Sequence, residues 1–519
     1  MLVDGINGAQ SAIRTLVNCG VEVCFGNPGT SEMHFVAALD SVPEMRSVLG
    51  LFEGVVTGAA DGYGRIAGKP AATLLHLGPG LANGLANLHN ARRASTPLVN
   101  IVGDHATYHL QYDAPLTSDI AGFARPVSHW VYESKSPGEV ASDTARAVQA
   151  ARAAPGQIAT LIMPADVAWN PAVRPAQMLP DIATTRVPAD TVDAIAKLLS
   201  NGKKSALLMR GGALLGDALE AAGRVAAKTG ARLMCDTFAP HTEFGAGRVP
   251  LERVPYFAEQ IVAFLKDVEQ LILVGAKPPV SFFAYPGKPS WGAPDGCYFD
   301  YLAQPHEDGA QAMIDLAAAL GTPSQPVARV ALALPDLPKG KLNSLGVAQA
   351  IAHLTPDHAI YSDDSVSSSL ALQLTLPKSR PHTHLSLTGG AIGQGLPLAI
   401  GAAIAAPDRK VVCLHGDGGA AYTMQALWTM ARENLDVTTV IFANRSYAIL
   451  NIELQRVGAS GAGRNAASML DLHSPEMNWT KIAEGLGVEA SRATTAEEFS
   501  AQYAAAMNQR GPRLIEALI

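Results

Sequence analysis

The sequence has few charged and few aromatic residues for its length. Of its 519 residues, 16% are charged and 6% are aromatic, and the net charge at pH 7 is −7. This small acidic excess excludes the basic surface that is typical of proteins that bind nucleic acids or membranes. Cysteine is also scarce, and the spacing of the five cysteines fits neither a metal site nor a disulfide scaffold. We therefore expect a protein of the reducing cytoplasm.

Long hydrophobic runs are also absent. The first twenty residues do not show a basic region followed by an apolar run, so no signal peptide is expected. The longest stretch without charge, residues 389–407, is interrupted by Gln394, two prolines and several glycines. Such a stretch is a poor membrane helix and instead predicts a buried glycine-rich turn followed by a helix.

Short apolar strands alternate with helical patterns in three blocks of the sequence. This alternation predicts an α/β protein built from three doubly wound parallel-sheet domains. The predicted domains cover residues 1–180, 188–325 and 340–519, and proline-rich connectors of weak periodicity separate them.

In the third block, an aspartate between glycines follows a strand in the stretch VVCLHGDGGA. Asp417 is either a helix N-cap or a carboxylate that holds a ligand, because burying an unpaired charge is costly. Asn444 closes the next strand, after one amphipathic helix expected over 421–433. Both residues then lie at the carboxyl edge of a parallel sheet, where Gly418 and Gly419 leave room for a ligand. Carboxylate and amide oxygens suit Mg²⁺ and a helix N-terminus suits phosphate, so we predict a Mg²⁺-diphosphate site.

The longer stretch GDGGAAYTMQALWTMARENLDVTTVIFANRS resembles the metal-binding motif of the thiamine-diphosphate-dependent 2-oxo acid decarboxylase and acetolactate synthase superfamily. The resemblance covers essentially the whole chain and makes the third block a diphosphate-binding domain. It implies that Asp417, Asn444 and the main-chain carbonyl of Ser446 bind Mg²⁺, which bridges the diphosphate. The other residues of this block that it implies as cofactor contacts are Gly416, Gly418, Gly419, Ser446 and Tyr447.

In the first block, a glutamate lies among apolar residues in LGLFEGVVTGAADGYGRIAGKPA. From the residues alone, Glu53 is most simply a buried, hydrogen-bonded structural residue. The resemblance instead makes this block a pyrimidine-binding domain and the middle block a Rossmann-like domain. It implies that Glu53 protonates N1′ of the aminopyrimidine, so that the 4′-imino group can deprotonate C2 of the thiazolium. Asn27, Pro28 and Gly29, in FGNPGTSE, are implied to bind the same cofactor.

The glycine-rich stretch LTGGAIGQGLPLAIGAAIAA matches a third motif of the superfamily. There a bulky aliphatic residue wedges the two rings of the cofactor into a V, and Ile392 aligns with it. Isoleucine is stiff at χ1, which suits a wedge, although a packed core isoleucine is the alternative. The carbonyl of Gly390 is implied to accept the hydrogen bond of the 4′-amino group. Ser367 aligns with a diphosphate contact, and a helix cap is the alternative.

Two further residues match benzoylformate-decarboxylase-like enzymes. His76 ends an apolar strand in TLLHLGPG, where it could relay protons near neutral pH or serve as a structural histidine. Thr30 aligns with a contact to the substrate carboxylate, or it caps a helix. A second active-site histidine of that subgroup falls near Phe282 in this chain. An apolar wall there favours an apolar substrate and removes a proton donor.

Other subtype signatures are incomplete. The middle block contains RGGALLG but no complete G-x-G-x-x-G, and the FAD-contacting patterns of acetolactate synthases are missing, so FAD is not expected. The Q-W-Q signature of those enzymes is also missing, because Leu454 stands at the tryptophan and only Gln455 is kept. His105 and His109 are separated in sequence, unlike the adjacent histidine pair of pyruvate decarboxylases.

The resemblance implies a C–C lyase or transferase that depends on thiamine diphosphate and Mg²⁺. It would decarboxylate a 2-oxo acid and either release an aldehyde or join the product to a second carbonyl compound. A non-catalytic regulatory homologue that binds thiamine diphosphate is the alternative, and a nicotinamide dehydrogenase would depend on RGGALLG alone. The resemblance also implies a homodimer or homotetramer, in which each cofactor lies between the first block of one subunit and the third block of its partner.

Overall fold

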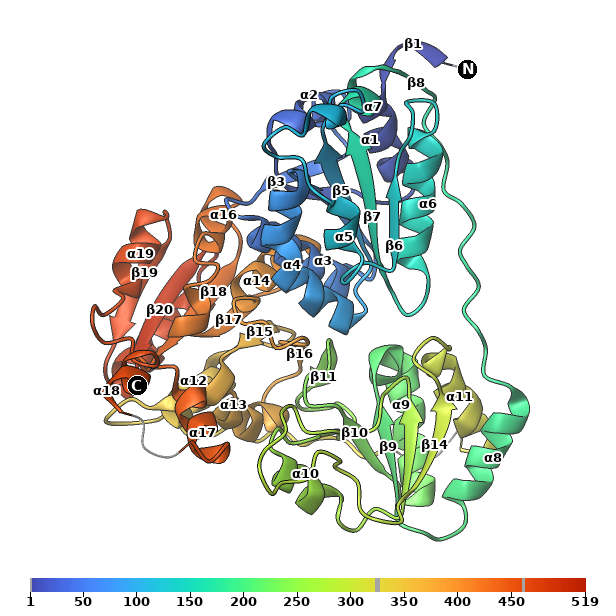
Figure 1. The fold of residues 1–519 in the computed structure, drawn as a ribbon. Helices are drawn as coiled ribbons and strands as arrows, with labels where there is room; N and C mark the ends of the chain where they lie inside the picture. The colour runs from blue at the N-terminus through green and yellow to red at the C-terminus, as the bar shows by residue number, and fades with distance from the viewer. Residues whose placement is uncertain (1, 323–326, 460–462) are drawn as a thin grey trace.

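The computed structural model describes residues 2–322, 327–459 and 463–519. It confirms the predicted α/β fold, because three mainly parallel sheets with flanking helices make up the chain (Figure 1). Within the described residues, no helix is both long enough and apolar enough to cross a bilayer.

The N-terminal sheet has six parallel strands in the order β3-β2-β4-β5-β7-β6. The strands are β2 (Val23–Asn27), β3 (Arg46–Leu49), β4 (Ala71–Leu75), β5 (Leu98–Asp104), β6 (Trp130–Glu133) and β7 (Ile158–Pro164). The helices of this region are α1 (Gly8–Asn18), α2 (Met33–Leu39), α3 (Glu53–Ala67), α4 (Leu77–Ala94), α5 (Ile120–Ala124), α6 (Val140–Arg152) and α7 (Ala165–Trp169). A separate antiparallel pair joins β1 (Leu2–Asn7) to β8 (Pro171–Val173). The strand order reverses between β2 and β4, so a ligand crevice is expected at their carboxyl ends.

The C-terminal sheet repeats this topology in the order β16-β15-β17-β18-β20-β19. Its strands are β15 (Ile360–Asp364), β16 (His382–Ser386), β17 (Val411–Gly416), β18 (Val437–Ala443), β19 (Glu489–Ala493) and β20 (Arg513–Leu518). Its helices are α12 (Ser344–Leu354), α13 (Ser369–Thr375), α14 (Gly395–Ala405), α15 (Asp417–Ala420), α16 (Ala426–Arg432), α17 (Ala448–Arg456), α18 (Arg464–Ser468), α19 (Trp479–Gly485) and α20 (Ala496–Met507). The order reverses here between β15 and β17, and Asp417 directly follows β17.

The middle sheet has five parallel strands in the order β12-β10-β9-β13-β14. The strands are β9 (Ser205–Met209), β10 (Arg232–Cys235), β12 (Glu252–Arg253), β13 (Gln270–Val274) and β14 (Tyr298–Ala303), and the helices are α8 (Ala189–Leu199), α9 (Gly216–Thr229), α10 (Ala258–Leu265) and α11 (Gly309–Ala319). One strand of this stretch, β11 (Thr242–Phe244), pairs antiparallel with β16. The C-terminal sheet therefore takes a strand from inside the predicted domain 188–325, while the domain boundaries themselves stay predictions.

Helices α3 and α14 pack closely between the N-terminal and C-terminal sheets (Figure 1). Glycines allow the close approach: a Cβ on Gly62 would lie 2.0 Å from the carbonyl oxygen of Leu398, and one on Gly401 would lie 1.9 Å from that of Ala59. One apolar core consequently extends from one sheet to the other. Of the buried glycine-rich turn and helix predicted over 389–407, α14 confirms the helix, whereas residues 389–392 of the turn are only partly buried.

The helix predicted over 421–433 is wrong in extent. Asp417–Ala420 forms a single short helix, the chain then turns, and α16 begins only at Ala426. A tertiary contact explains the break, because the Thr423 hydroxyl donates to the carbonyl of Gly393 at 2.7 Å. The amphipathic pattern could not reveal this contact, so no helix N-terminus lies at residue 421.

Candidate functional site

The first half of the site lies where β2 and β4 end. Asn27 closes β2, and His76 follows β4 as the N-cap of α4. His76 Nδ1 lies 2.8 Å from Glu32 Oε2, which also accepts a 2.7 Å hydrogen bond from the Gly29 N–H. A Cβ on Gly29 would lie 2.3 Å from His76 Nδ1, so only glycine fits beside this ring. The sequence analysis missed Glu32, although it stands in the quoted motif FGNPGTSE.

Glu53 is the first residue of α3 and is 7% exposed. The Asn83 side chain donates to Glu53 Oε2 at 3.0 Å. A Cβ on Gly80 would lie 3.2 Å from both Glu53 Oε1 and His76 Cβ, so the acid and the histidine border the same glycine. A helix N-terminus also favours a negative charge. The acid is therefore buried, fixed by Asn83 and close to His76.

Two cap interpretations from the sequence are wrong. Thr30 is exposed and begins a 3₁₀ helix (Thr30–Glu32) whose N-cap is Gly29. Ser367 lies inside a 3₁₀ helix (Val366–Ser368) whose N-cap is Ser365. The roles predicted for Thr30 and Ser367 in ligand binding stay predictions.

The second half of the site lies at the ends of β17 and β18. Asp417 is 3% exposed; its Oδ1 accepts from the Gly418 N–H at 2.8 Å, and its Oδ2 accepts from the Arg445 N–H at 2.6 Å. Asn444 Oδ1 accepts from the Ser446 N–H at 3.0 Å. Burial raises the pKa of Asp417, and the hydrogen bonds from Arg445 and Gly418 oppose that rise. Asp417 begins α15 after the cap residue Gly416, so it is not the N-cap that the sequence left open.

The oxygens of this second half fit a hard cation. Asp417 bonds to the N–H next to Asn444, so the two side chains lie at adjacent strand ends. Carboxylate and amide oxygens keep lone pairs beyond the backbone bonds that they accept here. In residues 2–322, 327–459 and 463–519, no three His, Cys, Asp or Glu side chains gather as a metal site. A cation at Asp417 would therefore need carbonyl oxygens and ligand oxygens as well, which is the set that Mg²⁺ accepts.

Ile392 lies in the loop between β16 and α14, near this second half. It is partly exposed and so is not a core residue, and a Cβ on Gly419 would lie 3.6 Å from Ile392 Cβ. Gly390 has a φ of +76° and packs against Phe282, since a Cβ there would lie 2.6 Å from Phe282 Cζ. The structure thus places Phe282, which the resemblance aligned with an active-site histidine, against the loop of Gly390.

Phe282 belongs to an aromatic surface of the middle block. Its ring centroid lies 5.6 Å from that of Phe238, 5.5 Å from that of Tyr256 and 4.8 Å from that of Phe283. Phe282 remains 41% exposed, so its ring can contact a ligand. This surface places apolar atoms beside Gly390.

His105 and His109 lie closer than their sequence separation suggested. Their ring centroids are 5.4 Å apart in the segment after β5. The two histidines are therefore separate in sequence but neighbours in space at this edge of the N-terminal sheet.

The comparisons with known proteins agree with these two halves. Residues 6–124 match the family model described as "Thiamine pyrophosphate enzyme, N-terminal TPP binding domain", and residues 365–517 match "Thiamine pyrophosphate enzyme, C-terminal TPP binding domain". "Putative acetolactate synthase large subunit IlvX" of Mycobacterium tuberculosis is 53% identical over 99% of both chains. Benzoylformate decarboxylase of Pseudomonas aeruginosa is 28% identical over 96% of both chains.

Solved structures show the same fold. A thiamine diphosphate-dependent 4-hydroxybenzoylformate decarboxylase of Rhodococcus jostii RHA1 has a TM-score of 0.85 at 23% identity and covers 99% of both chains. Benzoylformate decarboxylase from Polynucleobacter necessarius has a TM-score of 0.85 at 21% identity, over 99% of this chain and 98% of that one. The chain belongs to the thiamine pyrophosphate enzyme family.

Proposed function

We propose that the protein decarboxylates an apolar 2-oxo acid with thiamine diphosphate and Mg²⁺. The observation that carries this proposal is Glu53, buried at the start of α3 and hydrogen-bonded to Asn83 in the N-terminal half of the site. When bound, thiamine diphosphate supplies a carbanion nucleophile and an electron sink for decarboxylation. Glu53 would then hold the proton at N1′ of the aminopyrimidine, and Asp417 and Asn444 would hold Mg²⁺ together with the diphosphate.

The alternative of a non-catalytic homologue that binds the same cofactor is less well supported. Binding needs Asp417 and Asn444, but it does not need an acid kept in place at the pyrimidine end. Burying a carboxyl costs free energy unless its hydrogen bonds are met, and Asn83 meets one of them. The free-energy cost of burying the Glu53 carboxyl is explained if this group transfers a proton.

The aromatic surface supports an apolar substrate. Phe282 lies against Gly390, whose carbonyl is expected beside the reacting part of the cofactor. Leu454, which lies on α17, stands where acetolactate synthases carry an acceptor-selecting tryptophan. Apolar walls discriminate by the side chain that they bury, so aromatic and branched 2-oxo acids are favoured over pyruvate.

A panel of 2-oxo acids tests the substrate class. With Mg²⁺ and thiamine diphosphate, we expect kcat/KM for aromatic or branched 2-oxo acids to exceed that for pyruvate by roughly 10-fold or more, as expected for a few buried methylene equivalents. Replacing Phe282 with Ala should remove most of that preference, whereas the same change at the exposed Tyr298 of β14 should not. CO₂ release and coupled products are measured together, which separates aldehyde release from carboligation. If no 2-oxo acid gave CO₂, the proposed function would be wrong.

We also propose that the active site is completed between two copies of this chain. The two half-sites, with Glu53 and His76 in the N-terminal region and Asp417 and Ile392 in the C-terminal region, share no hydrogen bond among the described residues. A symmetric dimer can bring each half against the complementary half of its partner.

Mixed dimers test this arrangement. Glu53→Gln subunits and Asp417→Ala subunits, each inactive alone, are joined with different affinity tags and purified as hybrids. If sites form between subunits, one of the two sites in each hybrid carries neither change, and about half of the wild-type activity per dimer returns. Sites confined to one chain predict no recovery, because every chain then carries a defect.

A further inference from the structure

The loop that carries Gly390 and Ile392 is held from the N-terminal region of the same chain. Asn90 of α4, 0% exposed, donates to the carbonyl of Ala391 at 2.8 Å and accepts from its N–H at 3.2 Å. One side chain thus bonds both backbone groups of the residue between Gly390 and Ile392. The Asn87 side chain accepts a further 3.0 Å hydrogen bond from Asn90 and so fixes the amide.

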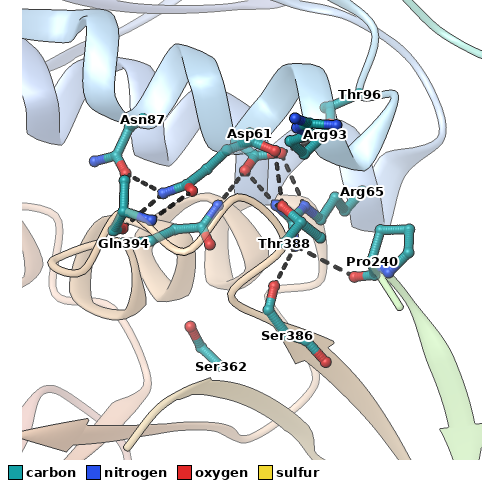
Figure 2. Close-up of polar contacts among 12 residues, drawn as sticks. Asp61, Arg65, Asn87, Arg93, Thr96, Pro240, Ser362, Ser386, Thr388 and Gln394 are labelled. Atoms are coloured by element: carbon teal, nitrogen blue, oxygen red, sulfur yellow. Dashed lines mark hydrogen bonds and ion pairs between the residues drawn. The ribbon is translucent and has the colours of Figure 1, made fainter. Parts of the chain in front are cut away.

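A buried ion pair on α3 holds the flanks of the same loop. Asp61 and Arg65 pair at 2.6 Å, and the Arg65 guanidinium donates to the Thr388 hydroxyl at 3.0 Å. Asp61 also accepts from the Gln394 side chain at 2.6 Å. Figure 2 shows these groups meeting between α3 and the loop, with Thr96 bonded to Asp61 as well. The network therefore attaches to the loop on both sides of Ala391.

The C-terminal region fixes the other end of the loop. Asp364, 2% exposed at the end of β15, accepts from the N–H groups of Gly393, Gln394 and Gly395 at 2.8, 3.0 and 3.2 Å. Together with Asn90, this carboxylate holds the backbone before and after Ile392. In the described part of the chain, the hydrogen bonds of this loop include none to the backbone N–H or carbonyl of Gly390 or Ile392.

We propose that Asn90, supported by Asp61, Arg65, Gln394 and Thr388, is a positioning residue that sets Ile392 and the Gly390 carbonyl for the cofactor. This inference rests on the proposed function, because those two groups act only if thiamine diphosphate binds. Asn90 acts on Gly390 and Ile392 through the backbone of Ala391, which lies between them. The α3–α14 packing already joins the N-terminal and C-terminal regions through apolar and glycine contacts. Holding these regions together therefore does not require two hydrogen bonds to the Ala391 backbone.

The test compares two buried asparagines. Asn90→Leu removes both bonds to Ala391 with little change of volume. Asn100→Leu is the control, because Asn100 of β5 is also 0% exposed but bonds only to Thr73 and Thr160. Should Asn90→Leu fail to fold, Thr388→Val, which deletes only a hydroxyl, takes its place.

Hydrogen exchange of the cofactor-free protein gives the first readout. We expect Asn90→Leu to speed exchange of the Ala391 N–H, which bonds to Asn90, about 10-fold or more, while Asn100→Leu leaves it as in the wild type. The second readout is the affinity for thiamine diphosphate with Mg²⁺, which should fall about 10-fold in Asn90→Leu alone. Equal exchange, or equal affinity, in the two variants would overturn the proposal.

Kinetics provide the third readout. A misplaced Ile392 should lower kcat about 10- to 100-fold and change the KM of the 2-oxo acid little, since positioning errors near 1 Å cost about that much. An unchanged kcat in Asn90→Leu would also overturn the proposal. If the wild type turned over no 2-oxo acid, the proposed function would fail, and exchange and cofactor affinity would still decide whether Asn90 sets the loop.

Discussion

Replacing Glu53 with Gln is expected to lower kcat by about 10²- to 10⁴-fold, the usual contribution of a positioned proton-transfer group. Glutamine keeps the size of the side chain and an oxygen that can accept from Asn83, but it cannot hold or give up the proton. The fold and the diphosphate end of the site should be unaffected, so thiamine diphosphate should still bind. The measurement is kcat with the best 2-oxo acid, together with exchange of the C2 proton of the bound cofactor followed by NMR.

A matched control separates this effect from the loss of any buried acid. Glu516 of β20 is 0% exposed and pairs with Arg492 at 3.0 Å, far along the chain from Glu53. Glu516→Gln should therefore reduce stability and leave kcat near the wild-type value. Wild-type turnover in Glu53→Gln at saturating cofactor would exclude the proposed role of the acid.

The strands and the edges where the half-sites lie could be predicted from the sequence. Short apolar runs such as those of β4 and β17 read directly as buried parallel strands, and the polar residue that closes each run lies at the carboxyl edge. His76 and Asp417 are two such residues, and both lie at a point where the strand order reverses. Local pattern was sufficient there because burial and chain direction fix the position of a strand end.

Positions that depend on distant contacts could not be predicted. The helix expected over 421–433 breaks because Thr423 bonds to Gly393, thirty positions earlier. The hydrophobic periodicity of the sequence does not indicate such a distant contact. The short strand β11 pairs with β16 from a different block, and its three residues carry too little pattern to assign it. In both cases tertiary contacts override the local preference of the chain.

The residues that support the site from behind could not be predicted from the sequence either. Glu32 orients His76, Asn83 holds Glu53 and Asp364 holds the loop of Ile392, yet each is an ordinary polar residue in sequence. Motifs identify groups that touch the cofactor, because that chemistry restricts the residue type. The groups behind them are identified only by hydrogen bonds across elements, so a structure is needed to find them.

Replacing Asp417 with Ala is expected to abolish the stabilisation that Mg²⁺ and thiamine diphosphate give together. Ligand at about 100 times its Kd stabilises a folded protein by about 2.7 kcal/mol, which should raise the Tm of the wild type by a few degrees. Loss of the proposed metal ligand should weaken cofactor binding about 100-fold or more, so the variant should show almost no rise at the same concentrations. The measurement is thermal unfolding with EDTA, with Mg²⁺ alone, and with Mg²⁺ and thiamine diphosphate.

The same variant carries a second expectation for the metal-free protein. Asp417 accepts hydrogen bonds from the N–H groups of Gly418 and Arg445, so its removal leaves both donors without this partner and should lower the Tm in EDTA. Asp143 of α6 is a matched control: it is 2% exposed and accepts from the Ser134 hydroxyl at 2.9 Å, outside both half-sites. Asp143→Ala should lower the Tm in EDTA and keep the full rise with Mg²⁺ and thiamine diphosphate. A wild-type rise in Asp417→Ala would mean that the metal, and with it the diphosphate, is held elsewhere.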